Sequence, residues 1–285
     1  MSRTFRVAAE FYQQFDADYS LDVPAEGYGG WGKADVELSL DHTAVVVMHA
    51  WDSGTRERYP GWYRAVEYLP RANRILETVF PPLLAAVRRS PLKLFHVAGG
   101  GAYHRKYPGY ARAEALAGPE PAGPEQALPD AALAALKRFR EERVSVGPGN
   151  RDDVARGFQD LDFPPQARPL DSEGVAVNAH QLFALCKDAG VNHLIYAGFA
   201  INWCLLLSPG GMADMRKHGV MCSALRQAVT AVENKETARR ELCKEVALWR
   251  VALGFGFVFD VNDFVRGLGR VKENQRDRLR SLTQA

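Results

Sequence analysis

The segment Val191-Asn-His-Leu-Ile-Tyr-Ala-Gly-Phe-Ala-Ile-Asn-Trp-Cys204 sets a largely apolar run before a glycine, and a cysteine follows after a short interval. Continuous apolar runs are typical of strands that are buried on both faces of a parallel sheet. Residues 193–198 are therefore predicted as such a strand. Ligands of open parallel sheets bind at the carboxyl ends of the strands. We therefore expect the functional centre within residues 191–219, with Cys204 at the rim of the sheet.

The same alternation of apolar runs and helical periodicity extends along the chain. Strands are predicted at residues 44–48, 92–97, 193–198, 220–225 and 256–259, and helices at 70–89, 130–142, 179–189, 212–218 and 236–249. A kink or restart is expected at Pro81-Pro82 inside the first helix, and Gly190 is expected to end the third. Alternating strands and helices predict an α/β fold with three layers, α/β/α, around one doubly wound and mostly parallel sheet.

One domain spanning residues 1–285 is predicted, because no internal repeat and no clear linker divides the chain. Residues 1–40 show little periodicity and are predicted to form an irregular N-terminal arm that wraps the domain. A long insertion is expected at about 99–174. It is predicted to contain an extended loop at 107–130 and an irregular polar stretch at 145–178.

Composition narrows the classes of partner. The chain has 285 residues, with 36 basic and 34 acidic side chains and a net charge of +2. This balance gives no electrostatic reason to expect a nucleic acid or an anionic membrane as partner, and the stretch 270–280, of mixed sign, is predicted to be a solvated tail. No stretch approaches the ~20 apolar residues that span a bilayer, and the N-terminus lacks the apolar core of a signal peptide. A cytoplasmic location is expected.

The four cysteines lie far apart, at Cys186, Cys204, Cys222 and Cys243, with no Cys-x-x-Cys pair. This spacing argues against a disulfide framework and a structural zinc site. Cys186, Cys222 and Cys243 fall inside predicted helices or strands and are interpreted as small core residues. Cys204 falls near the start of a helix, where a thiolate is favoured. The histidines lack metal-ligand spacing and residues 99–101 lack the features of a phosphate loop, so neither a metal nor a cofactor is expected.

The segment ending at Cys204, together with residues 43–48, the helix before Leu92 and the pair Glu236-Thr237, resembles the isochorismatase-like cysteine hydrolase superfamily. The resemblance covers most of residues 42–98 and 175–266. It implies the three-layer fold and a role for Cys204 as the nucleophile that attacks a carbonyl or related carbon. A thioester-type intermediate would form, and water would resolve it.

The resemblance also implies the local geometry of the site. A non-proline cis peptide bond is expected between Phe199 and Ala200. The backbone N–H groups of Ala200 and Cys204 would form the oxyanion hole. Relatives commonly form dimers or tetramers, so a homo-oligomer is expected.

Three features depart from the family pattern. His49 stands where the family aspartate ends the first strand. No lysine precedes the helix at 179–189, a region that offers only Arg168, Asp171 and Glu173. The segment Ser208-Pro-Gly-Gly211 is interpreted as a short insertion after the cysteine.

Two alternatives replace the missing base. His49 could deprotonate Cys204, since a Cys–His pair makes a thiolate near neutral pH; Asp52, Asp171 or Glu173 would then orient the ring. Asp52 could instead be the base, with the strand end shifted by one turn. We favour His49, because its alignment needs no gap.

Trp51, Asn202 and Trp203 are candidates for the wall of a pocket that holds a small planar substrate; the alternative for the two tryptophans is packing under the arm. The leading function is hydrolysis of a small molecule, at an amide or other C–N bond. The alternative is a protein that keeps the fold but is catalytically inactive and binds a small ligand or a partner. Vinyl ether cleavage without covalent catalysis ranks last, because the acidic residue is missing from the first strand.

Overall fold

A computed structural model of the chain describes residues 3–271. The strands are β1 (Thr4–Gln13), β2 (Gly30–Ser39), β3 (Thr43–Met48), β4 (Lys93–Val97), β5 (Gly174–Ala176), β6 (His193–Phe199), β7 (Met221–Thr230) and β8 (Val258–Phe259). The helices are α1 (Pro60–Ala65), α2 (Leu69–Thr78), α3 (Phe80–Arg88), α4 (Pro108–Ala117), α5 (Ala131–Arg143), α6 (Arg151–Gln159), α7 (Ala179–Ala189), α8 (Cys204–Leu207), α9 (Met212–Lys217) and α10 (Leu242–Gly254).

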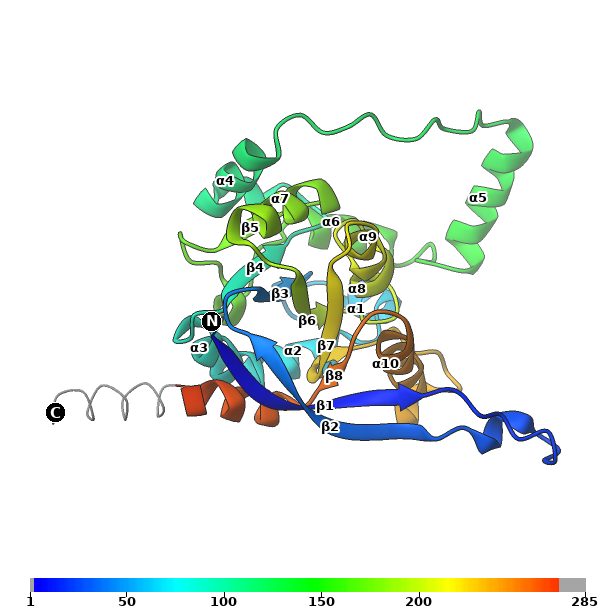
Figure 1. Cartoon of the computed structure of the whole chain (residues 1–285). Coiled ribbons are helices and arrows are strands. Elements are labelled where there is room, and N and C mark those ends of the chain that lie inside the picture. Colours follow the sequence, from blue (N-terminus) through cyan, green and yellow to red (C-terminus); the bar gives the residue numbers. More distant parts are fainter. Residues whose placement is uncertain (1–2, 272–285) are drawn as a thin grey trace, which may run out of the picture.

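All eight of these strands form one sheet in the order β2-β1-β8-β7-β6-β3-β4-β5 (Figure 1). The six strands from β8 to β5 run parallel, and β1 is antiparallel to both of its neighbours. β3 and β6 are buried along their whole length, which explains their continuous apolar sequences. Met48 pairs with Gly198, so both strands end at the same rim. The predicted fold class, a three-layer α/β protein with a mostly parallel sheet, is confirmed.

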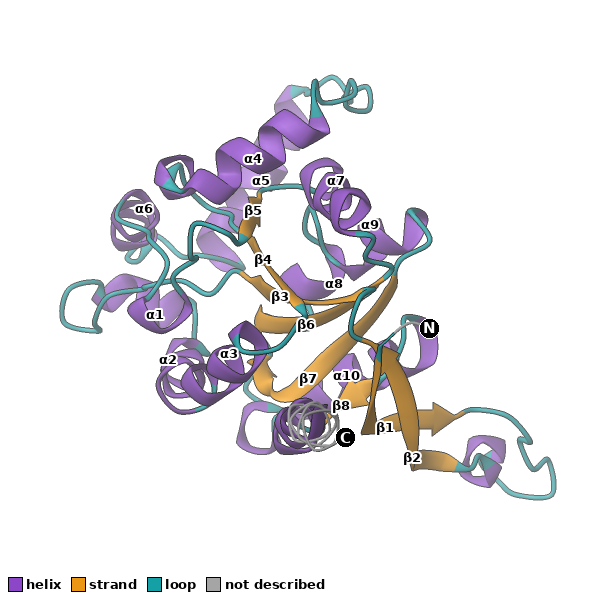
Figure 2. Ribbon diagram, turned by 60° about the vertical axis from the view of Figure 1, so that its left-hand side comes forward, coloured by secondary structure: helices purple, strands orange, loops and turns teal. Residues whose placement is uncertain are grey.

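Helices cover both faces of the sheet, and each face has its own apolar core. Figure 2 shows α2 and α3 against one face and α7 and α9 against the other. The first core includes Val45 and Val47 of β3, and the second includes Val46 and Met48. Alternate side chains of one strand therefore serve opposite cores, as a buried strand requires.

The N-terminal prediction is wrong. Residues 1–40 were expected to be irregular, but β1 and β2 form a long antiparallel hairpin that extends the sheet beyond β8. The sequence carries the signal, because Phe5, Val7 and Ala9 alternate with more exposed residues and point into the first core. This period of two marks a strand with one buried face.

The insertion is also more ordered than expected. The predicted loop at 107–130 begins with α4, for which Pro108 supplies a favourable first residue. The stretch at 145–178 holds α6 and the edge strand β5, which is too short to give a periodic signal. α5 lies where a helix was expected at 130–142, with Asp130 as its N-cap.

Elsewhere the predicted elements agree closely with the structure. α7 spans the predicted residues, and Gly190 ends it in the left-handed conformation, with φ of 66°. The helix predicted at 70–89 is divided into α2 and α3 at Val79, just before the two prolines. The helix expected from residue 236 begins only at Leu242. No helix in the described part of the chain is long and apolar enough to cross a membrane, and the predicted tail at 270–280 lies almost wholly outside it.

Candidate active site

Cys204 is the first residue of α8 and follows closely on the end of β6. The intervening loop is fixed at two points: the Ile201 N–H donates to the Thr230 carbonyl at 2.8 Å, and the Leu205 N–H donates to the Ala200 carbonyl at 3.1 Å. Cys204 is half-buried, whereas Cys186 and Cys222 are buried. Burial raises the pKa of both buried thiols to about 12, so neither forms a thiolate near neutral pH.

The loop before Cys204 carries two free backbone donors. The peptide bond between Phe199 and Ala200 is cis, at the bond named from the sequence. Among residues 3–271, neither the Ala200 N–H nor the Cys204 N–H donates a hydrogen bond to another group. Unpaired N–H groups next to a nucleophile are the donors that an oxyanion hole uses.

Gly198 allows β6 to approach β3 where both strands reach the rim. Its φ of +124° is unfavourable for other residues, and a Cβ there would collide with the Met48 carbonyl oxygen. The residue after Met48 is His49, so the close approach brings the backbone of His49 and the start of the cysteine loop to the same end of the sheet.

The His49 ring is packed between Trp51 and Gly99. It stacks on the Trp51 ring with a centroid separation of 5.2 Å, and a Cβ added to Gly99 would lie 2.5 Å from its Nε2 atom. His49 is only 8% exposed, and its Nδ1 atom has no hydrogen-bond partner among the described residues. Burial lowers the pKa of His49 to about 4. The ring is therefore neutral at pH 7.

None of the three candidate carboxylates hydrogen-bonds the His49 ring in the described structure. Asp52 is exposed and accepts a hydrogen bond from the Gly54 N–H at 3.1 Å. Asp171 is exposed as well.

Glu173 is the one buried carboxylate among these candidates, and it serves other groups. It accepts hydrogen bonds from Arg88 at 2.7 Å and contacts His96 Nε2 at 2.9 Å. Burial by itself would raise the pKa of Glu173, but the hydrogen bonds from His96 and Arg88 outweigh it and lower the pKa to about 2. Glu173 thus links α3, β4 and the segment before β5.

A residue that the sequence did not single out lies near the cysteine. Tyr68 directly precedes α2 and is 7% exposed. Burial raises the pKa of the Tyr68 hydroxyl, and the sulfur of Cys204 raises it further, which places the two groups within electrostatic range. Tyr68 therefore stays protonated near neutral pH. Only the fold brings residues so far apart in sequence together.

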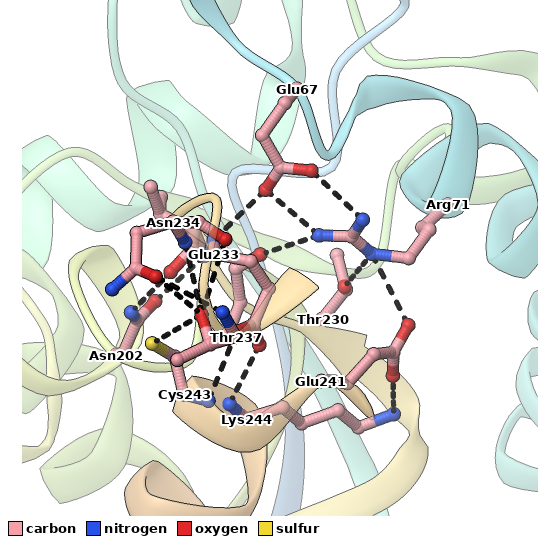
Figure 3. A network of polar contacts seen from close by, with 12 residues as sticks. Glu67, Arg71, Asn202, Thr230, Glu233, Asn234, Thr237, Glu241, Cys243 and Lys244 are labelled. Atoms are coloured by element: carbon pink, nitrogen blue, oxygen red, sulfur yellow. Dashed lines mark hydrogen bonds and ion pairs between the residues drawn. The ribbon is translucent and has the colours of Figure 1, made fainter. Parts of the chain in front are cut away.

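A polar network borders the cysteine loop on the side of β7 and α10 (Figure 3). Arg71 donates to Glu67, to the Thr230 hydroxyl at 3.1 Å and to the Ala231 carbonyl at 3.1 Å. The Asn202 side chain bonds both backbone groups of Val232, at 2.8 and 2.9 Å. The amide of Asn202 is therefore used to fix the loop to the end of β7.

A cavity of about 220 Å³ opens beside this network and is lined by Asn202, Leu206, Thr237, Leu242, Cys243, Val246, Ala247 and Arg250. Cys243 was interpreted as a core residue, but it is half-buried, with its sulfur 3.3 Å from the Thr237 hydroxyl. Trp203 is 59% exposed next to Asn202, while Trp51 lies with the first core. Of the three pocket candidates, Asn202 lines this cavity.

The chain is similar to known proteins in structure but not in sequence. No family model and no curated protein matches the chain in sequence. Among solved structures, a cysteine hydrolase from Pseudomonas syringae pv. phaseolicola 1448A matches 82% of this chain and 95% of its own, with a TM-score of 0.51 and 14% identity. The chain has the isochorismatase-like fold. At this identity, the likeness establishes the fold alone.

Two further solved structures match with lower TM-scores and the same low identity. An isochorismatase-like hydrolase from Alkaliphilus metalliredigens matches 79% of this chain and 98% of its own, with a TM-score of 0.46 and 14% identity. The YcaC gene product of Escherichia coli, described as an octameric hydrolase of unknown specificity, matches 84% of this chain and 85% of its own, with a TM-score of 0.41 and 14% identity.

Within this isochorismatase-like fold, the structure brings Cys204, two free amide groups and Tyr68 to one end of the sheet. The His49 ring stacks on Trp51, and none of the candidate carboxylates hydrogen-bonds it among the described residues. No cluster of three or more potential metal-ligating side chains occurs in the part of the chain that the structure describes.

Proposed function

We propose that this isochorismatase-like protein hydrolyses a small molecule, at an amide or other C–N bond, through a covalent intermediate on Cys204. The observation that carries the proposal is a half-buried Cys204 at the carboxyl end of β6, in a loop with two unpaired N–H groups. The four cysteines are all unpaired, which suits the reducing conditions of the cytoplasm, where we place the activity.

In the proposed reaction, the Cys204 sulfur attacks the carbonyl carbon, and the oxygen becomes negatively charged. The N–H groups of Ala200 and Cys204 stabilise that oxyanion. The C–N bond then breaks, and the amine leaves with the proton that came from the thiol. Water attacks the resulting thioester, the C–S bond breaks, and the acid and the free thiol are released.

The attack of Cys204 requires an acceptor for the proton of its thiol. His49 is neutral and so has a free site for a proton, but a pKa of about 4 makes it a weak base. Relative to an ordinary imidazole, this shift weakens proton binding by roughly 300-fold. His49 can act as the base only where the ring turns toward the cysteine or where substrate strengthens its hold on the proton. Asp52 remains the second candidate.

The burial of His49 and its low pKa favour a second candidate function. A buried His49 without a carboxylate partner is what a protein that binds a ligand but does not catalyse would tolerate. In this alternative, Cys204 is an ordinary thiol and the rim of the sheet binds a small molecule or a partner without turning it over.

Thiol reactivity separates the two functions. The chain is alkylated with iodoacetamide between pH 6 and 9, and each cysteine is followed by peptide mass spectrometry. If the protein is a cysteine hydrolase, Cys204 should react faster than Cys243, and its rate should level off at a pH below the ordinary thiol pKa of ~8.5. Buried Cys186 and Cys222 serve as unreactive internal references.

A hydrolysis assay completes the test. A panel of small aromatic and aliphatic amides is incubated with the wild type and with the Cys204→Ser variant, and amine release is measured. Removing a nucleophile is expected to lower turnover by about a thousandfold or more. Full activity in Cys204→Ser overturns the covalent mechanism. If no amide is hydrolysed and Cys204 reacts no faster than Cys243, the result supports the second candidate, a protein that binds a ligand without catalysis.

A further inference from the structure

The hairpin of β1 and β2 carries an exposed apolar tip. We define the arm tip as residues 14–28, the connection between the two strands with its short 3-10 helix. Figure 1 and Figure 2 both show it projecting away from the rest of the molecule. Within the described residues β1 pairs with β8 only at Ala9 and Glu10, and the outer half of the hairpin pairs only with itself. Large apolar side chains are exposed along this tip: Phe15 (55%), Tyr19 (88%), Leu21 (40%) and Val23 (52%).

Isolated two-stranded hairpins are only marginally stable in water, so an exposed tip of this kind gains stability if it packs against another surface. The hairpin is fixed to α10 of its own chain where the arm tip begins: Trp249 donates to Gln14 at 3.0 Å, and its ring centroid lies 6.2 Å from that of Tyr12. Beyond this anchor the tip has few contacts with the body. Exposed apolar patches rimmed by polar residues mark interaction sites.

The second surface surrounds the cavity at the start of α10. We define the receiving face as the cavity-lining residues, of which Val246 is 56% exposed, together with the exposed apolar side chains Trp203 (59%), Leu207 (64%) and Val232 (36%). Trp203 directly precedes α8 and Leu207 ends it, Val232 follows β7, and Val246 lies in α10. The face is therefore concave and largely apolar, whereas the arm tip is convex.

The two surfaces have opposite charge. The arm tip holds Asp16, Asp18, Asp22 and Glu26 and contains no lysine or arginine. The receiving face is bordered by Arg239, Arg240 and Arg250, all exposed. No ion pair involves any of these seven side chains within the described residues.

We propose that the arm tip of one copy docks on the receiving face of a second copy, with Tyr19 against the apolar wall of the cavity and the acidic side chains facing the three arginines. α10 anchors the arm of its own chain through Trp249 and presents Val246 and Arg250 to the partner. The exchange is reciprocal, so it is consistent with a two-fold dimer in which the same contact forms twice. The docked tip would lie next to Trp203, the neighbour of Cys204.

The test measures association of the chain of residues 1–285 by sedimentation velocity across a range of concentrations. The wild type is expected to be dimeric, and Tyr19→Asp and Val246→Asp are each expected to raise the dissociation constant about tenfold or more. The matched control is Leu128→Asp: Leu128 is 93% exposed in the loop between α4 and α5 and belongs to neither surface. It should leave the dimer unchanged.

A charge exchange tests the pairing itself. Arg250→Glu should weaken the dimer, and adding Asp22→Arg to it should restore association. All substituted side chains are exposed, so circular dichroism should show folded proteins throughout. A wild type that stays monomeric overturns the proposal, as does an oligomer that survives both Tyr19→Asp and Val246→Asp. If Tyr19→Asp and Val246→Asp weaken the dimer but the charge exchange does not restore it, the assigned pairing of the acidic side chains with the arginines is wrong. The readout is independent of catalysis by Cys204.

Discussion

At the scale of single residues, the packing of the His49 ring depends on one glycine of the run at 99–101. Gly99 follows β4 closely and lies against the His49 ring, where a Cβ would come within 2.5 Å of Nε2. Gly99→Ala is therefore expected to displace the ring from its stack on Trp51 and to lower the free energy of unfolding by about 1–3 kcal/mol. Urea denaturation measures this change.

The control and the contradiction come from two further variants. Gly123→Ala should be nearly neutral, because a Cβ there meets nothing within 4 Å. In a His49→Ala background the cost of Gly99→Ala should largely disappear, since the clashing atoms are gone. An unchanged cost in that background would show that the contact with His49 is not the cause.

At the level of residues, the sequence could predict only what is local along the chain. The position of Cys204 follows from the strand, glycine and spacing within residues 191–204. Tyr68 could not be found in this way, because its proximity to Cys204 depends on how α2 packs on the sheet. The environment of His49 was equally hidden: the sequence shows a histidine at a strand end, but not that its ring would stack on Trp51.

At the scale of elements, α10 begins later than its sequence pattern suggests because its N-terminus is capped from outside. Buried Glu233 accepts hydrogen bonds from the backbone N–H groups of Cys243 and Lys244, each at 3.0 Å. Its carboxylate satisfies free donors and faces the positive end of the helix dipole. Before that point, Asn234 and Thr237 hold a turn in place of helix.

Removal of this cap should loosen the first turn of α10. Glu233→Ala is expected to lower the free energy of unfolding by about 1–2 kcal/mol and to speed amide hydrogen exchange at residues 242–246. The exposed neighbour Glu236 provides the comparison, and Glu236→Ala should change neither quantity measurably. Equal exchange rates in Glu233→Ala and wild type would argue that packing, not the cap, holds the turn.

Elements were predictable where they are long and buried, as for β3, β6 and α7. They were missed where the signal is short or divided: β5 has three residues, and its pairing with β4 is fixed by the fold. The hairpin was missed although β1 alternates, because its outer half is exposed and reads as polar and irregular.

At the scale of the whole molecule, buried histidines make stability depend on pH. Burial lowers the pKa of His49 and His193 to about 4. Both groups bind protons in the unfolded chain below pH ~6.5 but stay neutral in the folded protein until about pH 4. Unfolding therefore takes up protons in this window, and stability falls as the pH is lowered from 6.5 to 4, by up to about 1.4 kcal/mol per pH unit for each group.

Glu173 extends the loss to lower pH, since its pKa of about 2 means that its stabilisation fades only below the ordinary glutamate value of 4.5. Urea unfolding at half-unit steps from pH 7.5 to 4.5 measures the slope. His49→Phe should make the slope shallower by about one proton. A flat profile between pH 6.5 and 4.5 would contradict the assignment.

The outer strand of the sheet also bears on how the chain avoids uncontrolled aggregation. β2 is an open edge of ten residues, long enough to recruit another strand. Its exposed side chains include Lys33, Asp35 and Glu37, and charged side chains along an edge strand oppose pairing with another strand. Growth by strand addition is thereby discouraged. The proposed docking of the arm tip would differ from such growth, because a reciprocal contact between two copies closes on itself and gives a particle of finite size rather than a fibril.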